Sequence, residues 1–126
     1  MQIGTLDHVN LRTTQLQTMV DWYERVLGMR SGDRPDFSFP GAWMYSGDHA
    51  AVHLVGIEGG PATGSETALK LEHFAFSASG QAAFEARLKE LGEAYRIGEV
   101  PGFGITQYNI WDPDGNHIHI DFRRET

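Results

Sequence analysis

The sequence contains no cysteine, so neither a disulfide framework nor thiolate ligation of a metal is available to it. It has no run of lysine and arginine, and its 10 basic against 17 acidic side chains give a net charge of −7, which argues against binding to a phosphate backbone. No apolar run approaches the roughly 20 residues needed to cross a bilayer, and no signal pattern begins the chain. We therefore expect a cytoplasmic protein without nucleic-acid or membrane partners, in which any metal is held by nitrogen and oxygen.

The composition is sufficient for one folded domain. Of the 126 residues, 40% are hydrophobic and 11% aromatic, which is enough apolar surface for a packed interior. The one stretch typical of a linker is 58–67, EGGPATGSET, which is rich in small and turn-forming residues. Within the single domain 1–126, it separates a first module of about residues 1–57 from a second of about 68–126.

The apolar periodicity predicts the same order of elements in both modules: a strand, a helix and three further strands. The first module is predicted to have strands at 2–12, 29–34, 42–46 and 50–57 and a helix beginning near residue 15; the second has strands at 71–76, 94–97, 106–111 and 116–123 and a helix over 80–91. Gly28 and Gly92 stand where helix stops are expected.

Three pairs of landmarks indicate an internal repeat. His8 and His73 are 65 positions apart, Gly28 and Gly92 are 64 apart, and His53 and His119 are 66 apart. The histidine and glycine pairs therefore share nearly the same offset, and differences of one residue are what loops of variable length allow. Because a solenoid needs at least three repeats, the pattern predicts two copies of a β-α-β-β-β unit instead.

The segment 111–122, WDPDGNHIHIDF, reads as a tight turn that leads into a strand of strict alternation. One face of this strand is apolar, with Ile118, Ile120 and Phe122. The other face carries His117, His119 and Asp121. A plain core strand needs no such face, so we expect a polar partner on that side.

The remaining histidines suggest what that partner is. Each module places one histidine on its first strand and another on its last, so a pseudo-twofold would bring His8, His53, His73 and His119 to one polar patch. Neutral imidazole is the commonest nitrogen ligand of first-row metals, and three or four such ligands with an open position typify a catalytic site. Taken singly, each could instead be a hydrogen-bonded strand histidine, but the matched positions favour a metal at His8, His73 and His119, with His53 as a further ligand. His49, in a turn beside Asp48, is expected to be solvated.

Four segments resemble a known family when they are taken together and in order. They are Leu6-Asp7-His8-Val9, residues 22–29 (WYERVLGM), residues 71–76 (LEHFAF) and residues 112–116 (DPDGN). The chain is similar in these to the vicinal oxygen chelate superfamily, which includes glyoxalase I, extradiol dioxygenases, and fosfomycin- and bleomycin-resistance proteins. The resemblance implies an α+β fold of two tandem βαβββ modules that form an incomplete mixed β-barrel around a divalent metal, with the helices outside. It also implies a homodimer.

In that family the first-strand histidine of each module is a ligand, which corresponds to His8 and His73. The last strand normally supplies a glutamate, but here that place holds His119, and the matching place in the first module holds His53. Imidazoles in place of carboxylates favour Fe, Ni, Co or Zn over Mg or Ca. Neither nearby carboxylate is expected to replace the glutamate, since Asp121 lies about 7 Å along the strand from His119 and Glu72 should face away from the side of His73.

The resemblance implies an enzyme of lyase, isomerase or dioxygenase type, in which two neighbouring oxygens of a small oxygen-rich substrate bind to the metal. His117 and Tyr108 are candidate acids or bases, or else wall residues. Arg12 is a candidate for an anionic substrate group, and Trp43, Tyr45 and Phe103 for an aromatic wall; a surface position and core packing are the ordinary alternatives. The loop 98–104 is either a flap or a plain surface loop.

Two other functions stay open at this point. One is a small-molecule sequestering protein of the bleomycin-resistance type, which holds a drug or metabolite without turnover. The other is a metal bound for structure or sensing, which full four-histidine ligation without an open position would favour.

Overall fold

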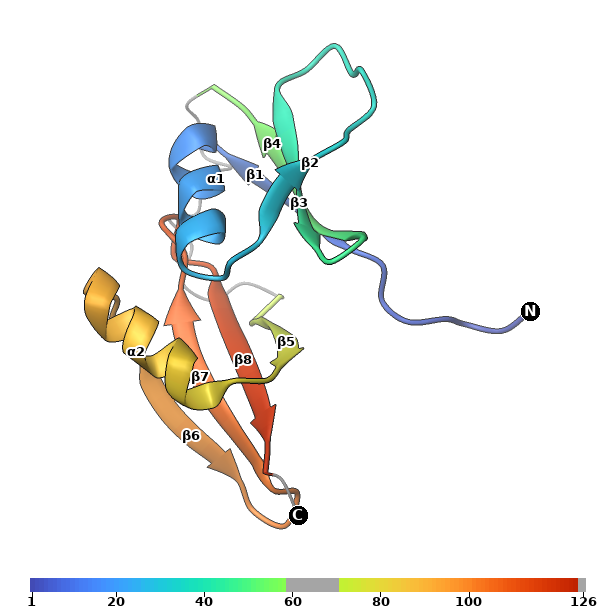
Figure 1. The fold of residues 1–126 in the computed structure, drawn as a ribbon. Helices are drawn as coiled ribbons and strands as arrows, with labels where there is room; N and C mark the ends of the chain where they lie inside the picture. Colours follow the sequence, from blue (N-terminus) through green and yellow to red (C-terminus); the bar gives the residue numbers. More distant parts are fainter. Residues whose placement is uncertain (59–70, 125–126) are drawn as a thin grey trace. The chain divides into compact units, whose positions relative to one another are not determined.

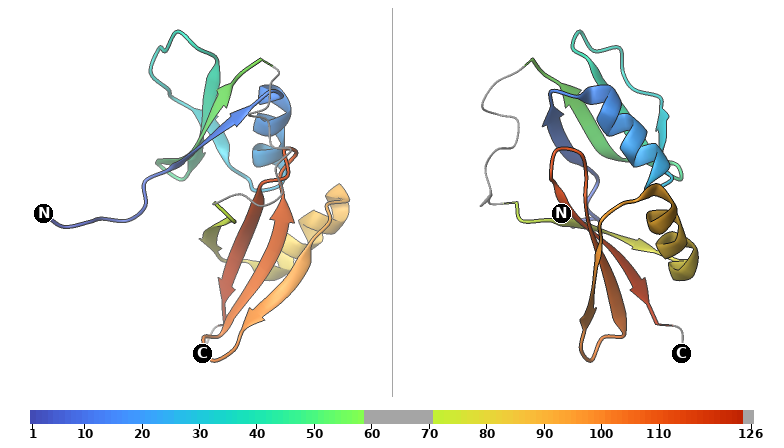
Figure 2. Two further views of the ribbon diagram at one scale, coloured as in Figure 1. Left: turned by 180° about the vertical axis from the view of Figure 1, so that it is seen from behind. Right: turned by 90° about the vertical axis from the view of Figure 1, so that its left-hand side faces the viewer.

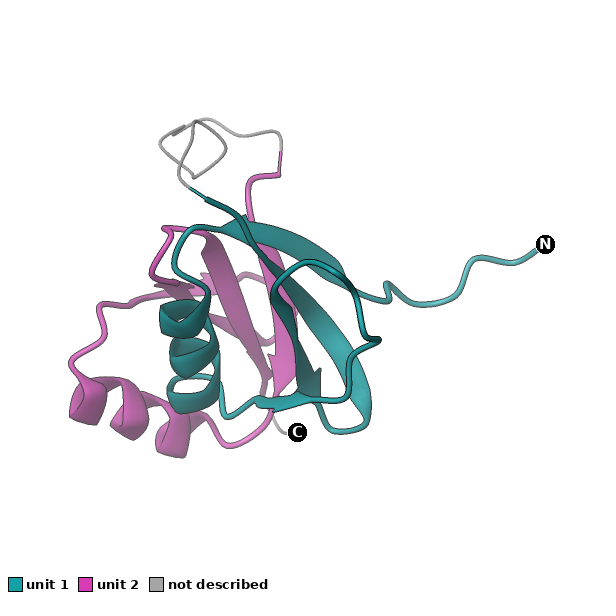
Figure 3. Ribbon diagram, turned by 90° about the horizontal axis from the view of Figure 1, so that it is seen from above, with its two compact units in different colours: residues 1–65 teal, residues 66–126 magenta. Residues whose placement is uncertain are grey.

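The structure is a computed structural model that describes residues 1–58 and 71–124. The chain divides into two compact units, Met1–Ser65 and Glu66–Thr126 (Figure 3). The predicted linker at 58–67 lies, apart from Glu58, outside the described residues. No helix in the described part of the chain is long and apolar enough to cross a membrane.

The first unit is built on a four-stranded sheet in the order β1-β4-β3-β2 (Figure 1). Its strands are β1 (Val9–Thr13), β2 (Arg30–Gly32), β3 (Gly41–Ser46) and β4 (His49–Gly56). β1 pairs with β4 in parallel, and the other two pairings are antiparallel. The first and last strands of the unit are therefore neighbours, which brings residues that are distant in sequence to one place on the sheet.

Helix α1 (Leu16–Arg25) covers one face of this sheet (Figure 2). The core between them is formed by buried apolar side chains, which include Met19, Val20 and Tyr23 of the helix and Met44, Val52 and Leu54 of the strands. Alternation along β1 and β4 then directs Asn10, Arg12, His53 and Val55 to the opposite, open face, where the ring of His8 stacks on that of His53.

The second unit repeats this order of elements. Its sheet has the order β5-β8-β7-β6, and its elements are β5 (Phe74–Ala78), α2 (Gln81–Leu91), β6 (Arg96–Val100), β7 (Ile105–Trp111) and β8 (His117–Arg123). β5 again pairs with the last strand in parallel. The ring of Phe84 on α2 lies 5.8 Å from the rings of Tyr108 and Phe122, which fixes the buried face of the sheet.

The predicted α+β class and the repeated β-α-β-β-β order are confirmed, and each unit has an open, mixed, four-stranded sheet. The strand starts differ from the prediction in one respect that concerns the site. His8 and His73 lie immediately before β1 and β5 instead of within them. The reason is that pairing with the last strand begins only at Val9 and Phe74, whose partners are Val52 and Ile118.

Candidate metal centre

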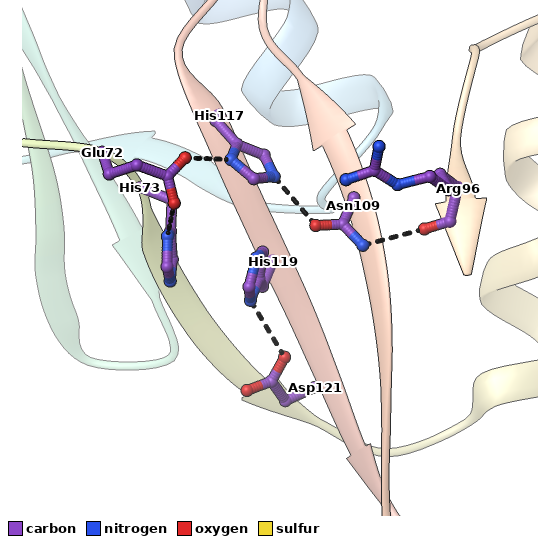
Figure 4. Close-up of polar contacts among 7 residues, drawn as sticks. All are labelled: Glu72, His73, Arg96, Asn109, His117, His119 and Asp121. Atoms are coloured by element: carbon purple, nitrogen blue, oxygen red, sulfur yellow. Dashed lines mark hydrogen bonds and ion pairs between the residues drawn. The ribbon is translucent and has the colours of Figure 1, made fainter. Parts of the chain in front are cut away.

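Three histidines of the second unit lie close together on the open face of its sheet (Figure 4). His117 and His119 are two residues apart on β8, and the parallel pairing of β5 with β8 brings His73 beside them. One nitrogen from each of the three rings lies within 4.8 Å of the others. The cluster therefore has the donors and the proximity that a metal site requires.

A turn before β8 sets the direction of these side chains. The buried carboxylate of Asp112 accepts hydrogen bonds from the backbone N–H groups of Asp114 and Asn116, at 3.0 and 2.9 Å. Gly115 completes the turn at φ +83°, a conformation that glycine adopts without strain. Because the turn fixes where alternation begins, it decides that His117 and His119 face the open side and Ile118 the core.

The carboxylate of Glu72 connects two of these rings. Oε1 accepts a hydrogen bond from Nδ1 of His73 at 2.6 Å, and Oε2 accepts one from Nδ1 of His117 at 3.0 Å. Bonds from His117 and His73 hold the pKa of Glu72 below its ordinary value. The expectation that Glu72 faces away from His73 is therefore wrong: residue 72 precedes β5, so strand alternation does not govern its direction.

His117 and Asn109 continue this network into the sheet. Nε2 of His117 lies 2.8 Å from Oδ1 of Asn109, a contact that is a hydrogen bond when Nε2 carries the ring proton, and Nδ2 of Asn109 donates to the backbone oxygen of Arg96 at 3.0 Å. Asn109 is buried, with 5% of its surface exposed. The network thus ends on the backbone of β6, a fixed point of the fold.

Asp121 lies on the same face as His119, with Oδ1 at 3.9 Å from Nδ1 of that ring. This oxygen is buried and has no hydrogen-bond partner in the described part of the chain. Burial, followed by the nearby rings of His73 and His117, lowers the pKa of His119, so this ring keeps a lone pair at neutral pH. A neutral imidazole beside an unsatisfied carboxylate oxygen is a donor set that suits a divalent cation.

The ring orientations add a condition to this fit. The rings of His73 and His119 are stacked, with centroids 4.0 Å apart and planes 14° apart. Because the lone pair of an imidazole lies in its ring plane, one of the two rings has to turn before both can bind one ion. The ring of His117, in contrast, is inclined by 68° to that of His119.

The first unit contains a second histidine pair. The ring of His53 lies between those of His8 and Trp43, at centroid distances of 3.8 and 4.0 Å. Nδ1 of His8 donates to Oδ2 of Asp7 at 2.6 Å, and Nε2 of His53 donates to the backbone oxygen of Ala50 at 3.1 Å. Burial and the proximity of His8 lower the pKa of His53. The rings of His8, Trp43 and His53 line an open pocket of about 530 Å³, together with Asp7, Tyr45, Asp48, His49 and Ala50.

A further pocket of about 410 Å³ lies on the same sheet face, lined by Asn10, Arg12, Phe39 and Val55. The strand register relates the two pockets, since Asn10 is paired with His53 and Arg12 with Val55. Arg12 is exposed, and its guanidinium has no ion-pair or hydrogen-bond partner among residues 1–58 and 71–124. An unpaired guanidinium beside an amide and an aromatic ring can receive an anionic group.

The other predicted site residues are placed as follows. Trp43 and Tyr45 line the His53 pocket, and the hydroxyl of Tyr45 donates to the backbone oxygen of Asp33 at 2.6 Å. Phe103 is 70% exposed in the turn between β6 and β7 and lines neither pocket described above. Tyr108 is paired with Ile120 and is fully buried, so it lies on the opposite face of the sheet from His117. A role for Tyr108 as an acid or base stays a prediction.

The sequence contained one signal for Glu72 that the prediction did not use. An acidic residue precedes the first-strand histidine in both modules, Asp7 before His8 and Glu72 before His73, at the same offset of 65. The pairs His8–His53 and His73–His119 belong to different units, so binding of one ion by all four stays a prediction.

Comparisons with known proteins agree with one another. A sequence model of the Glyoxalase/Bleomycin resistance protein/Dioxygenase superfamily matches residues 5–120. The chain is 28% identical over 125 residues to Glyoxylase I 4 of Arabidopsis thaliana, which covers 95% of this chain and 71% of that protein. A glyoxylase/bleomycin resistance protein/dioxygenase domain from Frankia sp. EAN1pec has a similar structure, with a TM-score of 0.80, 22% identity, and coverage of 98% of this chain and 100% of that one. The fosfomycin resistance protein FosX from Listeria monocytogenes gives a TM-score of 0.71 at 13% identity, over 98% and 96% of the two chains.

Proposed function

This chain belongs to the Glyoxalase/Bleomycin resistance protein/Dioxygenase superfamily, and we propose that it is a divalent-metal-dependent enzyme acting on a small, oxygen-rich organic molecule. The observation that supports this most directly is the cluster of His73, His117 and His119 on one sheet face. The fosfomycin resistance and glyoxylase names among its relatives are consistent with small-molecule chemistry. The reaction type that we propose is that of a lyase, isomerase or dioxygenase.

The proposed ligands are His73 and His119 from the second unit and His8 from the first, with His53 as a further ligand. All four offer nitrogen, so the ion is expected to be Fe, Ni, Co or Zn. When bound, the ion would act as a Lewis acid that polarises two neighbouring oxygens of the substrate and stabilises the negative charge that develops there.

The chain's own residues would prepare this site in two ways. The lowered pKa values of His53 and His119 keep both rings neutral at physiological pH, which a ligand must be. On the open face of the first unit, Trp43 and Tyr45 offer flat surfaces to a substrate, and Arg12 offers a charge for an anionic group. The role of His117 as an acid or base stays a prediction, since both of its ring nitrogens face acceptors.

Elemental analysis of the full chain, purified without a His-tag or chelator, tests this proposal. We expect about one Fe, Ni, Co or Zn ion per chain and loss of most of it in His119→Ala. The control is Glu99→Gln, an exposed change on β6 that should leave the metal content unchanged. Absence of metal from the wild-type chain, even after reconstitution with each ion, would contradict the proposal and favour a sequestering protein of the bleomycin-resistance type.

We also propose that the chain forms the homodimer expected from the family resemblance. Light scattering coupled to size-exclusion chromatography would give its mass in solution. A mass of 14.0 kDa, that of a single chain, would contradict the dimer.

A further inference from the structure

We propose that Glu72 is a positioning residue that selects the tautomer of His73, and that His117 and Asn109 hold Glu72 in place instead of binding the metal. The inference deepens the proposed function, on which its meaning for metal binding rests. The tautomer itself is a property of the metal-free chain. It can therefore be measured independently of any ion.

The selection follows from the bond between Glu72 and His73. An ionised carboxylate only accepts hydrogen bonds, so the 2.6 Å contact from Oε1 to Nδ1 requires the proton of His73 to be on Nδ1. Nε2 then keeps its lone pair. A hydrogen bond from the second nitrogen of a ligating histidine to a carboxylate is the usual way to orient the ring and raise its basicity.

The role of His117 follows from its two partners. Asn109 uses its Nδ2 as a donor to the backbone of Arg96, which turns its Oδ1 towards Nε2 of His117. Nδ1 of His117 faces the second oxygen of Glu72 at 3.0 Å. Both ring nitrogens thus face acceptors, a neutral ring donates its one proton to only one of them at a time, and binding a metal would displace one of these contacts. Proximity alone places His117 in the cluster, but its hydrogen bonds assign it to the support of Glu72.

The support crosses three neighbouring strands (Figure 4). Arg96 is on β6, Asn109 on β7 and His117 on β8, so each bond joins one strand to the next. Glu72 itself is exposed and precedes β5, where no strand pairing restrains it. The anchored His117 supplies the restraint that the local backbone lacks.

The first unit provides a natural comparison. Asp7 contacts Nδ1 of His8 at 2.6 Å, in the same way that Glu72 contacts His73. At the offset that relates His53 to His119, the counterpart of His117 is Ala51, which has no hydrogen-bonding side chain. In the first unit His49 is the second ring beside the carboxylate, with Nε2 at 3.5 Å from Oδ1 of Asp7 and a hydrogen bond to the backbone oxygen of Asp7.

The arrangement also accounts for charge. Where the family resemblance leads one to expect a ligand glutamate, this chain has His119. A set of neutral imidazoles leaves the charge of a divalent ion uncompensated. Glu72 places a negative charge on the residue that is hydrogen-bonded to the proposed ligand His73. The negative charge that would compensate the ion therefore lies next to a ligand and not on a ligand itself.

Long-range ¹H–¹⁵N correlation spectra of the metal-free full chain, labelled with ¹⁵N-histidine and recorded near pH 8, distinguish protonated from unprotonated ring nitrogens. In the wild type, we expect His73 to carry its proton on Nδ1. In Glu72→Gln, the amide can accept or donate, so the ¹⁵N shifts of His73 should move towards a mixture of tautomers. Asp7→Asn is the matched control, which should change His8 and leave His73 unaltered. A proton on Nε2 of His73 in the wild type, or unchanged shifts in Glu72→Gln, would overturn the inference.

Competition titration with Zn²⁺ gives a second readout, in which Glu72→Gln should weaken binding by about 10- to 100-fold. His117→Phe removes the support but keeps a ring beside Trp111, and it should have an effect of similar size. If both residues act through one network, the double variant should be no weaker than either single variant. Losses that multiply in the double variant would instead identify His117 as an independent ligand. Failure of the wild type to bind Zn²⁺ would contradict the proposed metal dependence. The spectra would still determine which tautomer His73 adopts.

Discussion

Tyr108 donates a hydrogen bond from its hydroxyl to Oε1 of Glu85 over 2.8 Å, and Tyr95 donates to the other oxygen of the same carboxylate, also over 2.8 Å. One side chain of α2 thus connects the helix to β7 and to the segment before β6. Burial, followed by the bond to Glu85, raises the pKa of Tyr108, and the bonds from Tyr108 and Tyr95 lower the pKa of Glu85. The carboxylate is therefore a structural clamp whose strength depends on its ionisation.

This clamp predicts how stability depends on pH. Because the folded-state pKa of Glu85 is below its ordinary value of 4.5, the unfolded chain takes up this proton first as the pH falls. The contribution of Glu85 is therefore present in full above that value and is lost as the pH falls through the folded-state pKa. Urea denaturation should show Glu85→Gln to be less stable than the wild type at neutral pH, with the difference shrinking in acid. A difference that is the same at both ends of the pH range would contradict this account.

Gly41 predicts a stability effect of a different origin. A Cβ atom added at this position would lie 2.5 Å from the backbone oxygen of Leu54 on the neighbouring strand and 2.7 Å from Nη2 of Arg34. Since a backbone atom cannot move aside cheaply, Gly41→Ala should lower the free energy of unfolding by about 2 kcal/mol. Gly4→Ala is the control, because nothing lies within 4 Å of its added Cβ. Equal denaturation midpoints for the two variants would show that β3 and β4 can separate locally.

The Arg12 pocket predicts selectivity for anionic ligands. Its guanidinium has no partner in the described structure, so a carboxylate that enters the pocket gains an ion pair together with its hydrogen bonds, whereas the oxygen of a neutral amide accepts a hydrogen bond without the ion pair. Calorimetric titration should show benzoate binding more tightly than benzamide, and Arg12→Gln should weaken benzoate binding by about 10-fold. Arg30→Gln removes an exposed arginine of the same unit and should have no effect. Equal affinities for the two probes would contradict a role for Arg12 in recognition.

The sequence predicted best those features that local periodicity determines. Along β8, the alternation of Ile118 and Ile120 with His117 and His119 follows from the strand period of two, and the structure confirms it. The repeat offset likewise predicted the second set of elements from the first. Both predictions depend only on the spacing of residues in the sequence, so they can be made without knowledge of tertiary contacts.

The sequence was least informative where pairing partners or side-chain direction decide the outcome. His8 and His73 fall before their strands because strand ends depend on a partner that is distant in sequence. Glu72 turns towards His73 because two histidines attract it, which a local pattern does not encode. Tyr108 could have been placed from the register between β7 and β8, but that register becomes visible only once the strands are paired.

The parallel pairing of first and last strands has a consequence for the order of folding. It draws the partners in each histidine pair, His8 with His53 and His73 with His119, from opposite ends of their own unit. Neither pair can meet until the last strand of its unit docks. Docking closes most of that unit into a loop, which costs conformational entropy. During synthesis, the first unit can fold and bring His8 and His53 together before the residues of β8 have been synthesised. An ion that arrives early would therefore meet the first pair alone, because docking of β8 assembles the second pair last.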